Sequence, residues 1–154
     1  MHNQLQRIDK MQRWFLHELQ VTDTQAFVEY NFAPPSIRRR IGILGFLHKR
    51  VLESCHPAMV KEFGFEPVQA GRYHDRSLVS HYAEVRAHSR VYNNSLYMYV
   101  LMYNRLPQEI VELPSVSSFQ KKLTKLAKDR ADQGHANWRC AYQDCKDVVD
   151  YFYA

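Results

Sequence analysis

Three consecutive arginines are the residues whose type and position most directly suggest chemistry. Arg38, Arg39 and Arg40 stand at the start of a helix predicted over residues 37–54. The helix dipole disfavours each cation there by about 0.3–1 kcal/mol, so their placement needs an explanation. One explanation is a bound anion, most simply a phosphate, where free amide groups and guanidinium groups converge. The other is pairing with nearby carboxylates such as Glu29 or Asp23, and the sequence leaves both open.

A second basic surface is expected on a helix that the sequence predicts from about residue 117 to Gln133. Its basic residues include Lys121, Lys122, Lys125 and Lys128. Of these, Lys121, Lys125 and Lys128 fall nearly opposite the apolar side chains of the same helix. Lysines in this pattern suit sequence-independent contacts with nucleic-acid phosphates. A row of lysines is also typical of a helix face that simply meets water, and the pattern alone does not separate the two.

Interleaved aromatic and basic residues could add base stacking to these phosphate contacts. Trp14 lies near Lys10 and Arg13 in the first predicted helix. We count these three residues, together with Lys49, among the candidate nucleic-acid contacts. Most of the ten tyrosines are expected in the core and at its rim.

The residue spacing gives little support to a metal site or to a catalytic site. Cys140 and Cys145 would lie about 140° apart on one helix, so they could not share a tetrahedral metal ion, and Cys145 fits a buried thiol better. Cys55 and His56 are adjacent, whereas a nucleophile and its base need to face one another. No glycine-rich phosphate loop or paired-aspartate metal site is present. We therefore expect no enzyme activity, no cofactor, no metal and no small-molecule substrate.

The elements that must carry these residues are predominantly helical. Helical spacing of apolar residues extends over residues 5–19, and Thr22, Asp23 and Thr24 offer N-cap oxygens for a second helix that ends before the Pro34–Pro35 corner. Further helices or helical turns are predicted over residues 37–54, 57–63, 95–103, 107–111, 117–133 and 136–153. The apolar segment 95–103 also suits a buried strand.

Three details of these helices can be checked directly. Gly42 and Gly45 each cost up to about 1 kcal/mol inside a helix, so we expect another helix to approach closely there. Ser117 followed by Gln120 suggests a capping box, and Gly134 fits the residue that ends the same helix. Residues 64 to about 80 are predicted to be irregular, and residues 78–91 suit either a short hairpin or a helix.

Composition sets the broad class of the protein. The chain has 154 residues, of which 45% are apolar, and its 21 lysines and arginines against 16 acids give a net charge of +5. We expect one mainly α domain over residues 1–154, built as a bundle of about six helices. No apolar segment approaches the about 20 residues that span a bilayer. The first seven residues lack a secretory pattern and three cysteines cannot all pair, which favours a reducing intracellular compartment over secretion.

Several motifs together resemble the region that follows the polymerase domain in non-LTR (LINE-type) retrotransposon reverse transcriptases. They occur in the family's order and are IDKMQRWFLHEL (residues 8–19), NFAPP (31–35), RRRIGILGFLHK (38–49), YNRLP (103–107) and SVSSFQKKL (115–123). The family often has an acid where Arg40 stands, and residues 64–91 match poorly. Its catalytic aspartates belong to an upstream domain that this sequence does not contain.

The resemblance implies a helical, thumb-side element that helps to hold template RNA and the nascent duplex. The arginines at 38–40 and the lysines at 121–128 would then contact phosphates of RNA or DNA without sequence specificity. A second hypothesis is a retroelement-derived structural subunit that binds other proteins of a larger, ribonucleoprotein-like assembly. A third is a decayed fragment without selected function. The subunit hypothesis predicts a contiguous exposed apolar patch larger than that expected on a monomer.

Overall fold

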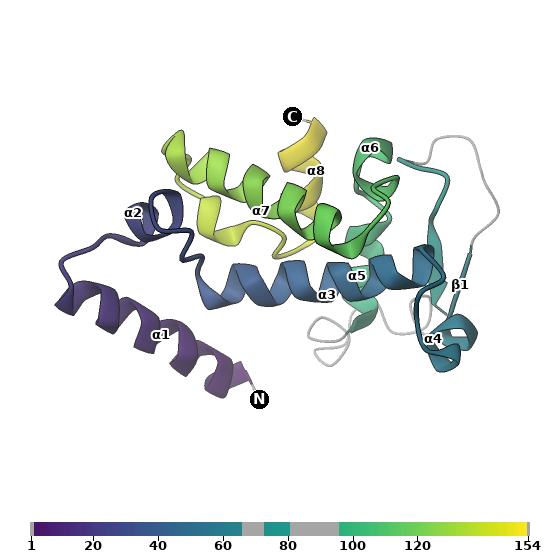
Figure 1. Ribbon diagram of the computed structural model, residues 1–154, viewed down its shortest axis with the longest axis horizontal. Coiled ribbons are helices and arrows are strands. Elements are labelled where there is room, and N and C mark those ends of the chain that lie inside the picture. The colour runs from purple at the N-terminus through teal and green to yellow at the C-terminus, as the bar shows by residue number, and fades with distance from the viewer. Residues whose placement is uncertain (1, 66–72, 81–95, 154) are drawn as a thin grey trace.

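The computed structural model describes residues 2–65, 73–80 and 96–153 (Figure 1). The mainly helical expectation is confirmed, with eight α-helices in these ranges rather than about six, since the short α4 and α6 add to the longer ones. In chain order the elements are α1 (His2–Glu18), α2 (Asp23–Val28), α3 (Pro35–Val51), α4 (Pro57–Glu62), β1 (Phe63–Phe65), β2 (Leu78–Ser80), α5 (Leu96–Tyr103), α6 (Gln108–Val111), α7 (Val116–Asp132), the 3-10 turn η2 (Trp138–Cys140) and α8 (Cys145–Tyr153). No helix among the described residues combines the length and apolar character needed to cross a bilayer.

The centre of the fold is the packing of α7 along α3 (Figure 1). Pro35 opens α3 as its first helical residue, where a missing amide hydrogen costs nothing, so the expected diproline corner is confirmed. Both helices bury an apolar stripe against one core, with Ile37, Ile41, Leu44 and Leu47 from α3 and Phe119, Leu123, Ala127 and Ala131 from α7. The two helices that carry the basic clusters are therefore held together by the hydrophobic effect.

The close helix approach predicted from the two glycines of α3 occurs at one of them. A Cβ at Gly45 would lie within 2.9 Å of the Gln120 side-chain carbons on α7, and Gly45 is buried. Gly42 is exposed, and a Cβ added there would meet nothing within 4 Å beyond its own helix backbone, so the same expectation is wrong at this position. Gly45 thus sets the spacing between α3 and α7.

The ends of α7 correct one expectation and confirm another. The capping box joins Ser115 and Ser118, rather than Ser117 and Gln120, because the Ser115 hydroxyl accepts from the Ser118 amide at 3.1 Å. Gln120 is one turn inside the helix, where it packs on Gly45. Gly134 follows the helix with φ +74, the left-handed conformation that favours glycine, as predicted.

The structure decides two predictions for the middle of the chain, namely the form of residues 96–103 and the pairing of residues 78–80. Residues Leu96–Tyr103 form helix α5, so the strand alternative for this apolar segment is wrong. Strand β2 pairs antiparallel with β1 in the register Phe63 to Ser80 and Phe65 to Leu78, which places the partner of residues 78–80 upstream of the expected hairpin. The rest of that hairpin, residues 81–91, lies outside the described residues.

The prediction of one continuous helix over residues 136–153 is wrong. The structure has the short turn η2, then an irregular link, and then α8. Tyr142 adopts φ +60 in the link and donates its hydroxyl to the Leu123 carbonyl at 2.9 Å, so its buried ring fixes the chain on α7. Asp144 then caps α8, accepting from the amides of Lys146 and Asp147.

Helix α1 is confirmed as a helix, but its apolar face is mostly uncovered. It runs along the edge of the structure, at the lower left of Figure 1. Leu16 is the one buried large apolar residue of this helix among those whose side chains are described. Ile8, Phe15 and Leu19, expected on the core-facing stripe, are exposed. The sequence pattern correctly predicted an amphipathic helix, but it did not indicate whether another element would cover the apolar side.

Candidate nucleic-acid interface

Two of the three arginines at the start of α3 are partly buried and bind other segments of the protein. Arg39 Nη2 lies 2.9 Å from Asp9 Oδ2 of α1, forming a partly buried ion pair. Arg40 Nη1 donates to the carbonyls of Arg139 and Ala141, both at 3.0 Å. Burial lowers the pKa of Arg40, but a guanidinium still remains charged at any physiological pH. Arg39 and Arg40 therefore join α1 and the η2 segment to α3.

The carboxylate-pairing explanation is correct in kind for Arg39, although the partner is Asp9 instead of Glu29 or Asp23. Asp23 pairs with Arg139 at 2.8 Å, while Glu29 accepts from Gln25 within its own helix. The distant pairing with Asp9 spans 30 residues of sequence, so no local pattern could have indicated it.

Arg38 differs from its two neighbours because it is exposed, whereas Arg39 and Arg40 are partly buried. Its Nη2 donates to Gln12 Oε1 at 3.3 Å, and its guanidinium lies 5.5 Å from the centre of the Phe32 ring. Neither contact neutralises the charge. Of the three arginines, Arg38 is thus the one whose cation remains open to an external anion.

The lysines of α7 border a groove of about 410 Å³ on the protein surface. Its lining is wholly polar apart from aliphatic stems, and consists of Asn31, Ser117, Gln120, Lys121, Thr124, Lys125 and Lys128. Three cations and no carboxylate face this groove, which makes it a site of positive potential. Lys122 is exposed on α7 but does not line the groove. None of the three arginines of α3 lines it either.

The partners of these lysines leave their charge available. Lys125 Nζ lies 2.8 Å from Asp129 Oδ2, but at 72% exposure the pair is a surface contact that water and salt readily exchange. Lys128 Nζ donates to Asn31 Oδ1 at 2.7 Å, a neutral acceptor that keeps the ammonium over the groove. Lys121 has no ion-pair or hydrogen-bond partner in the described part of the chain.

The remaining predicted contacts are scattered over other helices. Lys10, Arg13 and Trp14 are all exposed on α1, with Trp14 at 67% exposure, and Lys49 is exposed near the end of α3. None of these four lines the α7 groove. The structure therefore places three of the eleven predicted residues in the lining of one groove and leaves the other eight outside it.

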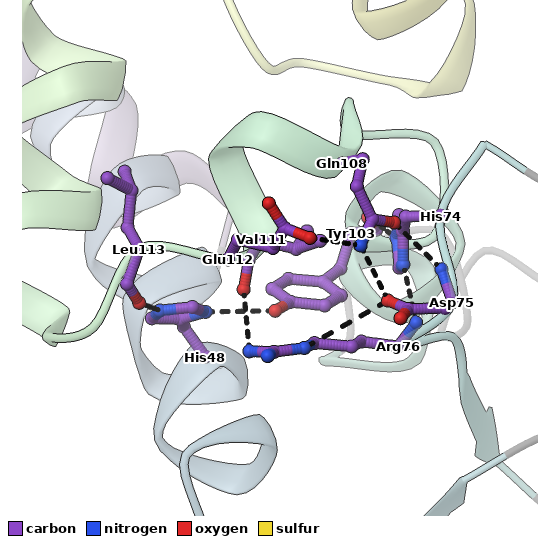
Figure 2. Close-up of polar contacts among 9 residues, drawn as sticks. All are labelled: His48, His74, Asp75, Arg76, Tyr103, Gln108, Val111, Glu112 and Leu113. Carbon is purple, nitrogen blue, oxygen red and sulfur yellow. Dashed lines mark hydrogen bonds and ion pairs between the residues drawn. The ribbon is translucent and has the colours of Figure 1, made fainter.

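A buried polar network, which the sequence did not indicate, lies beside the α3–α7 contact (Figure 2). His48 is fully buried, stacks on Phe119 with ring centres 4.2 Å apart, and has both ring nitrogens bonded. Its Nε2 lies 2.9 Å from the Leu113 carbonyl and its Nδ1 lies 2.9 Å from the Tyr103 hydroxyl. Since a carbonyl can only accept, Nε2 carries the proton and Nδ1 accepts from Tyr103.

Burial shifts the pKa values of two groups in this network. It lowers the pKa of His48, helped by the positive charge of Arg76, and it raises the pKa of the Tyr103 phenol. Both groups are therefore neutral at pH 7.

The same network anchors the segment that leads into β2. His74 bonds through Nε2 to the Tyr103 carbonyl at 3.0 Å, and Arg76 Nη1 donates to the Val111 carbonyl at 3.2 Å (Figure 2). The Asn104 amide makes two hydrogen bonds to the backbone of Leu78. The YNRLP motif thus has a structural role, because its Tyr and Asn hold residues 73–80 against α5 and α6.

A second, apolar groove lies between α1 and α2. It has a volume of about 320 Å³ and is lined by Phe15, Leu16, Leu19, Val21, Ala26, Tyr30 and Phe32. Asn31, whose neighbours Tyr30 and Phe32 line this groove, lines the lysine groove instead. The two grooves are therefore separated by a single turn of chain, in which Asn31 has φ +54.

The cysteines and other metal-binding residue types do not assemble into a site. Within residues 2–65, 73–80 and 96–153, no three histidines, cysteines or acids are grouped to hold a metal ion. Cys145 is half-buried against the core, where burial raises the pKa of its thiol and Arg105 Nη1 lies 3.2 Å from the sulfur. The expected role of Cys145 as a packing thiol agrees with this environment.

Comparison of the chain with protein-family models, with curated proteins and with solved structures finds no match. The function must therefore be inferred from the surfaces themselves.

Sequence reasoning missed four residues of the lysine groove, and three of them had a detectable signal. Ser117, Gln120 and Thr124 follow the helical spacing of Lys121, Lys125 and Lys128, so a helical wheel places all six on one side of α7. Asn31 lies 97 residues from Lys128 in sequence, and its position depends on tertiary packing.

Proposed function

We propose that this chain binds the phosphate backbone of RNA or DNA, without sequence specificity, through the lysine groove of α7. The observation that carries the proposal is a concave polar surface with three lysines and no acid in its lining. Phosphate contacts of this kind supply affinity and positioning and carry no base information.

The spacing of the lysines suits a nucleic-acid strand. Lys121, Lys125 and Lys128 stand at i, i+4 and i+7 of one helix, which spreads three cations over about 10 Å of its axis. Along the axis of a duplex each strand has one phosphate per about 3.4 Å, so a row of this length spans about three phosphate intervals and its three lysines can each reach a phosphate within them. Asn31, Gln120 and Thr124 add neutral hydrogen-bonding groups between the cations.

Two further observations support a binding role without catalysis. The net charge of +5 favours anionic partners. The resemblance to the segment after a retrotransposon polymerase domain implies contact with template RNA and its duplex, while the catalytic aspartates of that family belong upstream. Arg39 and Arg40 are left out of the proposed interface because they bind within the protein.

The experiment measures fluorescence anisotropy of a labelled RNA hairpin and of a labelled DNA duplex between about 50 and 200 mM salt. Affinity is expected to fall steeply with salt. Changing Lys121, Lys125 and Lys128 together to Gln is expected to reduce the slope of log affinity against log salt by about three, since each lost phosphate contact contributes about 0.9.

The matched control changes Arg7, Lys61 and Lys146 together to Gln, which removes the same charge from exposed positions outside the groove. If both triple variants lose affinity equally, net charge rather than the groove explains binding. Absence of binding to either probe at the lowest salt concentration would disprove the proposal.

A second candidate function, binding of another protein, is favoured by one specific observation. The apolar side chains of α1 are exposed and adjoin an apolar groove against α2. The subunit hypothesis requires an exposed apolar patch of this kind. We propose that the protein-binding surface is this apolar groove, which lies on the side of residues 30–32 that faces away from the lysine groove.

A further inference from the structure

The lining of the lysine groove contains neutral hydrogen-bonding groups as well as cations. Beside its three lysines it holds the side chains of Asn31, Ser117, Gln120 and Thr124. No aromatic ring belongs to this lining in the described part of the chain, so the groove offers no platform for base stacking. A nucleic acid bound here is therefore held along its backbone, which consists of phosphates and sugars.

Thr124 occupies the groove between two of the lysines. It stands three residues after Lys121 and four before Lys128 on α7, so both lysines are its neighbours on the helix surface. Thr124 is half-buried, whereas Lys121 is exposed. Phosphates bound by these two lysines would flank the threonine.

The hydroxyl of Thr124 is set to accept a hydrogen bond from a ligand rather than to donate one. Its single hydrogen is donated to the Gln120 carbonyl at 2.8 Å, the bond that a threonine within a helix makes to the residue four before it. The oxygen keeps lone pairs for a donor. Among the described residues, no group donates to this oxygen.

The remaining charged and amide groups of the groove supply donors. Asn31 Oδ1 accepts from the Lys128 ammonium at 2.7 Å, and because an ammonium can only donate, this contact fixes the orientation of the amide. The two hydrogens on Asn31 Nδ2 are then directed to other acceptors, such as phosphate or sugar oxygens. Donors suit the backbone of any nucleic acid, so the acceptor at Thr124 is the group that can discriminate between backbones.

The backbones of RNA and DNA differ in one hydrogen-bond donor, the ribose 2′-hydroxyl, which DNA lacks. This hydroxyl is attached to the sugar carbon next to the one that carries the 3′ phosphate, so it lies close to a phosphate held by a lysine. We infer that the lysine groove binds RNA in preference to DNA, with the Thr124 hydroxyl accepting a hydrogen bond from a ribose 2′-hydroxyl between phosphates held by Lys121 and Lys128. This preference rests on the proposed phosphate binding and names the substrate class for the same groove.

The test compares three labelled hairpins of equivalent sequence in anisotropy titrations against the full chain at about 50 mM salt. The first is RNA, the second is RNA with fluorine in place of each 2′-hydroxyl, and the third is DNA. The 2′-fluoro hairpin keeps the A-form helix but has no 2′ hydrogen to donate, so it separates the hydroxyl from helix shape. RNA is expected to bind about two- to tenfold more tightly than the other two, the range that one net hydrogen bond gives.

Variants of Thr124 then locate the contact. Thr124→Val removes the accepting oxygen and keeps the branched shape of the side chain. It is expected to weaken RNA binding to the level of the 2′-fluoro hairpin and to leave the other two affinities unchanged, because those backbones do not donate to Thr124. Thr124→Ser keeps the hydroxyl and is the matched control, which should retain the preference for RNA. Circular dichroism verifies that both variants fold.

The other outcomes separate this preference from the proposed function. Equal affinity of the unmodified protein for the RNA and 2′-fluoro hairpins would overturn the preference, while a salt slope that depends on Lys121, Lys125 and Lys128 would keep the proposed function. Equal weakening of all three hairpins by Thr124→Val would assign this residue to the shape of the groove and would also overturn the preference. If no hairpin binds, both the preference and the proposed function fail.

Discussion

The basic start of α3 and the lysine row of α7 are two regions of similar composition with different structural roles. Each lies on a helix of 17 residues, and the two helices pack on each other. At the start of α3, Arg39 and Arg40 bind a carboxylate and two carbonyls of the same protein. On α7, the lysines face water around an open groove.

The difference follows from side-chain chemistry and from what lies within reach. A guanidinium has five donors in a flat fork, so Arg40 can satisfy two backbone carbonyls of an irregular segment at once. An ammonium on a flexible stem remains hydrated and gains little from an exposed acid such as Asp129. Cationic residues therefore indicate a ligand site where the fold leaves their charge facing water and held only by exposed contacts.

The largest effect that separates the two regions is expected for Arg40→Ala. Removal of the guanidinium leaves the Arg139 and Ala141 carbonyls without their donor, so the free energy of unfolding should fall by about 2–3 kcal/mol. Urea denaturation measures this change. Arg38→Ala is the matched control, and it should cost less than about 1 kcal/mol because its contacts are exposed. Equal losses for both variants would show that the internal bonds of Arg40 contribute little.

The next effect concerns the contact that joins the two regions. Gly45→Ala should lower the free energy of unfolding by about 1–2 kcal/mol, because the added methyl group meets Gln120 in the α3–α7 interface. Gly42→Ala, on the open side of the same helix, should raise it by up to about 1 kcal/mol through helix propensity. Thermal unfolding compares the two, and Gln120→Ala should relieve the defect of Gly45→Ala. A stabilising Gly45→Ala variant would contradict this account.

A smaller effect is expected from pH at His48, which bridges α3 to the chain before α7. Its folded-state pKa is lowered by burial, so the unfolded chain binds more protons and stability falls as pH drops below about 6.5. Above that pH its contribution is fully present. His48→Gln should flatten the dependence of the free energy of unfolding on pH between about 5 and 7, and an unchanged dependence in this variant would contradict the account.

The smallest stability effect should come from the lysines of the groove. Changing Lys121, Lys125 and Lys128 to Gln removes only exposed contacts, so the free energy of unfolding should change by less than about 0.5 kcal/mol. Urea denaturation of the triple variant checks this value. A loss as large as that of Arg40→Ala would mean that the lysine row, too, serves the fold.

Local physics made much of the fold predictable from the sequence. Helical spacing identified α1, α3 and α7, the diproline identified the corner between α2 and α3, and Gly134 identified the end of α7. Each of these signals acts within one or two turns of chain. The break at Tyr142 escaped prediction because the residues on both sides keep helical spacing. Its cause is a hydrogen bond to Leu123, 19 residues away.

The sequence by itself determined that this chain is mainly helical, basic, and amphipathic along α1 and α7, because hydrophobic period and charge are local properties. Tertiary structure alone decided which cations bind within the protein and which face a groove, and that the apolar side of α1 lies open. Those outcomes depend on contacts between distant segments, such as Asp9 with Arg39 and Asn31 with Lys128, whose geometry exists only after the core has packed.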